Sequence, residues 1–243
     1  MKPVRTLGAR LERAVGPALI DKPCSVPRDH DQPDREFRRR RIVVGVVLVI
    51  GATLLGFSLA VEPGDALFYL LTLAVAATWI VGGLLSGPLH LGYEYVRGRA
   101  RRPVLTPLAI GLIAAAVFLL GALIVREIAP LRDYVVSVLE HARKGNLTLI
   151  AIVTVVNGVA EEVFFRGALF AAIGRRRPVL ISTVVYALAT TATGNPMLVF
   201  AAVTLGTVLA LQRRASGGVL GPIITHVVWS TAMLFTLPVL LHA

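Results

Sequence analysis

Two adjacent carboxylates and a guanidinium lie in the middle of a long apolar stretch. Glu161 and Glu162, followed by Arg166, fall inside the apolar run 147–173. On a helix, Glu162 and Arg166 lie one turn apart in the favourable acid-before-base order, so we expect them to pair. Glu161 points about 100° away, with Asn157 one turn before it. We therefore expect Glu161 to be less fully neutralised, and suited to act as a general base.

Later apolar runs carry polar side chains that could meet this pair. His226 has apolar neighbours, with Ser230 one turn later, and Thr190 lies one turn after Tyr186 on another helix. Glu161 and Thr190 lie about 12 residues from one end of their spans and His226 about 8, or roughly 12–18 Å of helix. The spacing predicts that three helices meet in one polar layer.

The composition excludes an ordinary soluble domain. Of the 243 residues, 56% are hydrophobic and 16% charged, and the mean hydropathy is +0.75, whereas soluble domains are about one quarter charged. The net charge of +11 could indicate a nucleic-acid partner, but the cations cluster between apolar runs, as in multi-pass membrane proteins. We expect no nucleic acid as a partner. The lone cysteine, Cys24, is read as a free thiol.

The apolar pattern predicts an all-α, polytopic membrane helix bundle of seven spans. Two spans, 178–193 and 197–212, give only about 24 Å of helix against a hydrocarbon core of roughly 30 Å, and are placed inside the bundle. Apolar and charged residues alternate at helical spacing in 126–146, which predicts an interfacial amphipathic helix. The spans are 42–61, 66–86, 104–125, 147–173, 178–193, 197–212 and 218–240.

Charge also indicates how the chain is organised in the membrane. We divide it into a basic tail (1–41), N-terminal transmembrane helices (42–125) and a transmembrane core (126–243). All four arginine clusters fall on one side if the spans alternate, which places the N-terminus of this cell-membrane protein in the cytoplasm. The clusters are Arg38 to Arg41, then Arg97, Arg99, Arg101 and Arg102, then Arg175 to Arg177, then Arg213 and Arg214.

The polar motifs resemble those of a known family. The run Glu161-Glu162-Val-Phe-Phe-Arg166-Gly167 is similar to the first motif, EExxxR, of the CAAX prenyl protease and bacteriocin-processing (CPBP, or Abi) intramembrane proteases. The family's FxxxH and HxxxN motifs have counterparts, in the same order, at Tyr186–Thr190 and His226–Ser230. The resemblance covers residues 130–240, so that 126–243 is interpreted as the catalytic core.

The resemblance implies hydrolysis of a peptide bond in a membrane-associated protein or peptide. Transferred to this chain, Glu161 is the base that activates water. Glu162 and Arg166 fix the helix geometry and polarise the site. His226, supported by Ser230, donates to the developing oxyanion.

Thr190 stands where the family has a histidine, and Ser230 where it has an asparagine. A threonine hydroxyl can hold a water molecule but cannot accept its proton at neutral pH. Glu161 then acts alone, or Asn157 or Asn195 compensates, or catalysis has been lost.

Other functions and a metal remain open at this point. We assign no cofactor; if zinc is bound, its ligands would be Glu161, Glu162 and His226. The rival to the protease is a non-catalytic membrane protein of the same fold, serving as a scaffold, immunity or sorting factor. A proton-coupled transporter is a third reading, because buried carboxylates also relay protons. The expected partners are membrane lipids and the substrate, and the oligomeric state is left open.

Overall fold

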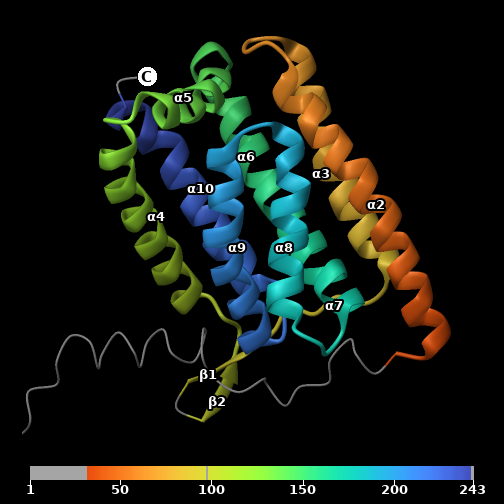
Figure 1. Ribbon diagram of the computed structural model, residues 1–243. Helices are drawn as coiled ribbons and strands as arrows, with labels where there is room; N and C mark the ends of the chain where they lie inside the picture. Colours follow the sequence, from red (N-terminus) through yellow and green to blue (C-terminus); the bar gives the residue numbers. More distant parts are fainter. Residues whose placement is uncertain (1–31, 97, 242–243) are drawn as a thin grey trace, which may run out of the picture.

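The computed structural model describes residues 32–96 and 98–241, which form a bundle of helices (Figure 1). Most of the predicted basic tail, with Cys24, and Arg97 lie outside the described residues. In chain order the elements are α2 (Asp34–Ala60), α3 (Ala66–Ser86), β1 (Glu94–Val96), β2 (Arg99–Arg101), α4 (Leu105–Val125), α5 (Ala129–Lys144), α6 (Leu147–Glu161), the π-helix η1 (Glu162–Leu169), α7 (Phe170–Ile173), α8 (Pro178–Thr190), the 3₁₀ turn η2 (Thr191–Thr193), α9 (Pro196–Ser216) and α10 (Leu220–Leu240).

The helices confirm a polytopic membrane bundle. Within the described residues, six helices are long and apolar enough to cross a membrane, and the seventh predicted span is the shorter apolar helix Pro178–Thr193. The prediction of a short span at 197–212 is wrong, because α9 has 21 residues. Asn195 caps its start, and the helix continues through the arginines that we read as loop until Gly217, in the left-handed region at φ 73°. The protein is an integral membrane protein.

The first membrane helix begins earlier than predicted. α2 starts at Asp34, so the arginine cluster before the apolar run belongs to the helix. Arg40 is fully buried and donates from Nη2 to the Pro88 carbonyl at 3.0 Å. Arg41 donates from Nε to the Ala172 carbonyl at 3.1 Å. These two arginines therefore attach the start of α2 to the connection after α3 and to α7.

The predicted amphipathic segment is a helix, α5, which lies across one end of the bundle (Figure 1). Its His141 Nε2 lies 3.1 Å from the Val61 carbonyl oxygen in a hydrogen bond. On the same helix the Tyr134 carbonyl accepts from Asn195 Nδ2 at 2.7 Å. These contacts attach α5 to the α2–α3 connection and to the start of α9.

The arginine-rich segments gather at the opposite end (Figure 1). The start of α2, the antiparallel β1–β2 hairpin, the α7–α8 loop and the α9–α10 connection all lie there. This is the arrangement that the alternating spans predict for the described arginines. The hairpin has only three residues per strand and was not predicted, because its arginine-rich sequence lacks an apolar alternation.

An apolar core joins α2 and α3 to the π-helix. The Trp79 ring of α3 is fully buried and packs against Phe164 and Phe165, with ring centroids 4.5 and 5.1 Å apart. Gly51 of α2 faces the same indole, and a Cβ there would overlap the ring. Glycine is therefore required for α2 to approach α3 this closely.

Candidate active site

The two acidic residues stand at the junction of α6 and η1. α6 begins at Leu147, where the Asn146 side chain caps the first turn, and its last residue is Glu161. From Glu162 to Leu169 the backbone hydrogen bonds follow the wider π-helical pattern. Such segments are rare and often occur at functional sites. Glu162 is fully buried, whereas Glu161 is only half-buried.

Glu162 has two charged or polar partners, and the predicted ion pair is confirmed. Arg166 Nη1 donates to Glu162 Oε1 at 3.1 Å, with the two side chains 1% and 0% exposed. His226 Nδ1 of α10 lies 2.8 Å from the same oxygen. Arg166 Nη2 donates to the Gly206 carbonyl of α9 at 3.0 Å. One carboxylate and one guanidinium thus join η1, α9 and α10.

Glu161 has a different partner, Tyr186 of α8. The Tyr186 hydroxyl donates to Glu161 Oε2 at 2.5 Å. The phenol ring packs against Phe165, with centroids 4.6 Å apart, and Arg166 Cζ lies 4.6 Å from the ring centroid. Three helices therefore meet in one polar layer as predicted, but α8 contributes Tyr186 to it. The sequence contains a signal for this contact, since Tyr186 occupies the first position of the FxxxH counterpart.

His226 lies against α6 at Gly158. Gly158 lies one turn before the acidic pair, and a Cβ built there would be 3.8 Å from both His226 Cδ2 and Ser230 Oγ. The edge of the imidazole away from Glu162 therefore faces a residue without a side chain. At these distances a Cβ would be in ordinary van der Waals contact with α10, so Gly158 marks a close approach of α6 and α10 beside the ring.

The other predicted site residues bond within their own helices. The Thr190 hydroxyl donates to the Tyr186 carbonyl at 2.8 Å, and the Ser230 hydroxyl to the Val227 carbonyl at 3.3 Å. Asn157 Nδ2 donates to the Val153 carbonyl at 3.0 Å. Asn195 caps α9 and contacts α5, so both ends of its amide bond groups outside the polar layer.

Two polar residues of α9 support the site and were missed. Arg213 Nε donates to the Arg166 carbonyl at 2.6 Å, and this carbonyl lies within the π-helix. Gln212 Nε2 donates to Thr225 Oγ1 at 2.8 Å, one residue before His226. In the sequence these residues stand at the end of a span, where Arg213 is read as a topology signal.

The donor side chains of the polar layer do not converge on one point. Among residues 32–96 and 98–241, no group of three or more His, Cys, Asp and Glu side chains is arranged to hold a metal ion. The alternative ligand set of Glu161, Glu162 and His226 is divided, because Glu162 and His226 bond each other while Glu161 bonds Tyr186. Since these donors point to different partners, the set does not fit zinc, and no step below uses a metal.

The comparisons with known proteins agree with the motif resemblance. Residues 143–232 match the family model described as "Type II CAAX prenyl endopeptidase Rce1-like". The matched region contains all the residues of the polar layer. No curated protein and no solved structure matches the chain. At the level of the family, the match supports an intramembrane protease of the CAAX type.

Proposed function

We propose that this chain is an intramembrane endopeptidase in which Glu161 activates the water that attacks a peptide bond of a membrane-associated protein or peptide. The observation that carries the proposal is the unequal partnering of two neighbouring carboxylates. Glu162 is buried between Arg166 and His226, so its charge is already neutralised by these partners. Glu161 is half-buried, and its bond from Tyr186 is made by a neutral phenol.

Tyr186 holds the Glu161 carboxylate through Oε2, and this leaves Oε1 to accept a hydrogen bond from water. As the water oxygen attacks the peptide carbonyl carbon, its proton passes to Glu161. Glu161 then returns that proton to the nitrogen of the leaving amine, and the C–N bond breaks. General acid–base catalysis of this kind contributes about 10²- to 10⁴-fold.

His226 is the donor to the oxyanion. Its Nδ1 is held by Glu162, which fixes the plane of the ring, and its Cδ2 edge lies beside Gly158 of α6. An imidazolium carries an N–H on both nitrogens, so Nε2 can donate to the tetrahedral oxygen while Nδ1 stays bonded. We place the arginine-rich end at the cytoplasm, following the positive-inside rule, with substrate arriving from that side or from lipid.

The test is cleavage of a library of quenched, membrane-anchored peptides by detergent-purified protein. Glu161→Gln keeps the shape of the side chain and removes the base, and we expect the rate to fall about 10³-fold. Glu127→Gln is the matched control, because the same change is made at an exposed side chain outside the site. Both variants should elute as the wild type does on size exclusion. Equal cleavage by Glu161→Gln and wild type would contradict the proposal, and metal content is recorded in the same samples.

A specific observation favours a second function, a non-catalytic membrane protein of the same fold. Thr190 and Ser230 replace the family's histidine and asparagine, and both hydroxyls bond their own helices. In this case Glu161→Gln leaves the cellular phenotype intact, and the folded wild-type protein cleaves none of the peptides.

A further inference from the structure

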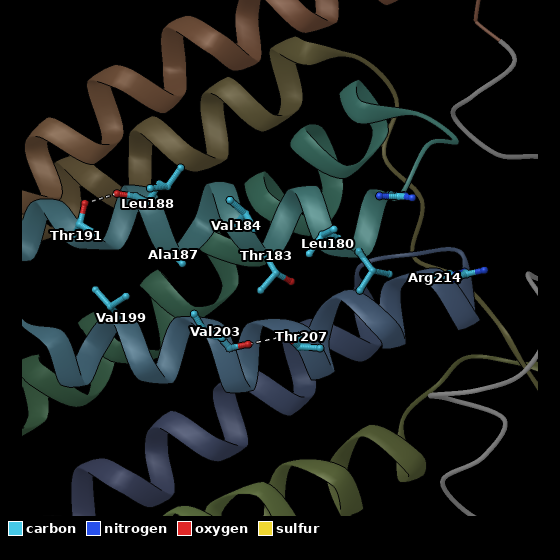
Figure 2. A pocket seen from close by; sticks show the side chains of 12 residues that line it. Leu180, Thr183, Val184, Ala187, Leu188, Thr191, Val199, Val203, Thr207 and Arg214 are labelled. Carbon is cyan, nitrogen blue, oxygen red and sulfur yellow. Dashed lines mark hydrogen bonds between the residues drawn. The ribbon is translucent and has the colours of Figure 1, made fainter.

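A groove runs along the outer side of the bundle between α8 and α9 (Figure 2). Its volume is about 580 Å³, within the range of small-ligand sites. Neither acidic residue of the polar layer lines it. The lining residues are Arg177, Val179, Leu180, Thr183, Val184, Ala187, Leu188, Thr191, Val199, Val203, Thr207 and Arg214.

The length and lining of the groove suit one hydrocarbon chain. Its walls are mostly aliphatic, and Leu180, Leu188 and Val203 are 56%, 63% and 45% exposed. From Arg177 to Thr191 the groove follows about 21 Å of helix. One leaflet contributes about 15 Å of hydrocarbon, so an acyl chain that starts at the arginine end fits within this length.

Positive charge is confined to one end of the groove. Arg177 precedes the first turn of α8, and Arg214 lies in the last turn of α9. This is the end where the described arginine clusters gather (Figure 1). Basic pockets between transmembrane helices bind anionic headgroups, and the helix N-terminus at Arg177 adds donors and a favourable dipole.

The backbone at Arg177 is unusual. Among the described residues it is the one non-glycine residue with a positive φ, at 49°. Side chains other than glycine, asparagine and aspartate rarely adopt this region, and such conformations cluster at functional sites. An arginine stands here, although a glycine would adopt the turn without strain.

Thr183 supplies a polar atom inside the apolar part. Its side chain lies between α8 and α9 (Figure 2), and its hydroxyl oxygen is buried without a hydrogen-bond partner. The other two threonines of the groove differ, because Thr191 donates to the Leu188 carbonyl and Thr207 to the Val203 carbonyl. Thr183 lies about 9 Å along α8 from Arg177. In a phospholipid the ester carbonyls lie between the phosphate and the acyl chains, and Thr183 likewise lies between the arginine end of the groove and Thr191.

We propose that the groove binds one acyl chain of an anionic phospholipid. The phosphate lies at Arg177 and Arg214, the ester carbonyl accepts from the Thr183 hydroxyl, and the chain extends along the aliphatic walls toward Thr191. This proposal does not depend on the protease proposal, because the groove residues and the catalytic residues are separate sets.

The probe is phosphatidylglycerol, with phosphatidylcholine as the neutral comparison. Native mass spectrometry of the purified full-length protein measures the one-lipid adduct with each. We expect wild type to prefer phosphatidylglycerol, and Arg177→Gln/Arg214→Gln to lower that adduct about thirtyfold. Arg99→Gln/Arg101→Gln is the control, since it removes two charges from the exposed strand β2 at the same end.

A second pair of variants tests the apolar part without changing charge. Val203→Trp fills the groove and should remove the adduct, whereas Val117→Trp places the same side chain on the exposed face of α4 and should not. The proposal is overturned if wild type binds both lipids equally, if the Arg99→Gln/Arg101→Gln control loses as much adduct as the groove pair, or if Val203→Trp retains the adduct. Normal peptide cleavage by the groove variants would separate this result from the catalytic proposal.

Discussion

Both sides of the π-helix η1 are buried, but one side packs aromatic rings and the other forms an ion pair. Toward α3, Phe164 and Phe165 pack against the Trp79 ring. Toward α9 and α10, Glu162 and Arg166 are equally buried but form an ion pair that His226 and backbone carbonyls complete. One helix thus presents an aromatic side and a charged side.

This difference indicates what each side is for. Burial of aromatic rings stabilises the fold directly, whereas a buried ion pair loses hydration, and apolar residues of similar volume are often as stable or more so. The aromatic side therefore suffices to hold η1 in the bundle. The charged side is better explained by the chemistry of the site, and the predictions below separate the two.

The largest effect is expected at Arg166. Arg166→Ala leaves the Glu162 carboxylate buried without its guanidinium, which typically costs about 3–5 kcal/mol. The variant should lose both this stability and peptide cleavage, measured by equilibrium unfolding in mixed micelles and by the peptide assay.

A double variant tests whether the Glu162–Arg166 pair is needed for stability or for cleavage. Glu162→Leu/Arg166→Met replaces the pair by apolar side chains, and we expect it to recover most of the stability while cleavage stays lost. If the double variant is as unstable as Arg166→Ala, the ion pair is a structural clamp. If it cleaves peptides, the charged side has no catalytic role.

On the aromatic side, Trp79→Ala should reduce stability with little effect on chemistry. Removal of a buried tryptophan side chain costs about 3–5 kcal/mol, since Phe164, Phe165 and Gly51 cannot close the space. The folded fraction, measured at a temperature where the variant is still native, should cleave within about threefold of wild type. A loss of kcat as large as that of Arg166→Ala would show that the two sides are not separable.

Much of this organisation could be predicted from the sequence. Helical spacing predicted the Glu162–Arg166 pair, and the apolar runs predicted the bounds of α3 and α4 to within one residue. Charge clustering predicted that the described arginine segments share one end. These features depend on local spacing and on hydropathy, which a single sequence contains.

The rest depends on contacts between distant residues. Gly206, which accepts from Arg166, lies 40 residues from it, and Tyr186 lies 25 residues from Glu161. The sequence pattern predicted a continuous α-helix over 147–173 and not the π-helix that begins at Glu162. The prediction began α2 too late and ended α9 too early because it placed their arginines in the tail and outside the span, although the long stems of arginines allow them to continue a helix into the membrane interface.

The smallest effect is expected at Tyr186, which contacts both the aromatic side and the acidic residue Glu161. Its ring packs on Phe165, and its hydroxyl donates to Glu161. Tyr186→Phe keeps the ring and removes one hydrogen bond to a charged group, so we expect kcat to fall about tenfold with KM and stability nearly unchanged. Thr190→Val is the matched control, since it removes a hydroxyl that bonds its own helix and should leave kcat unchanged. An unchanged kcat in Tyr186→Phe would assign Tyr186 to packing alone, whereas a loss confined to kcat would make it the residue that positions the base.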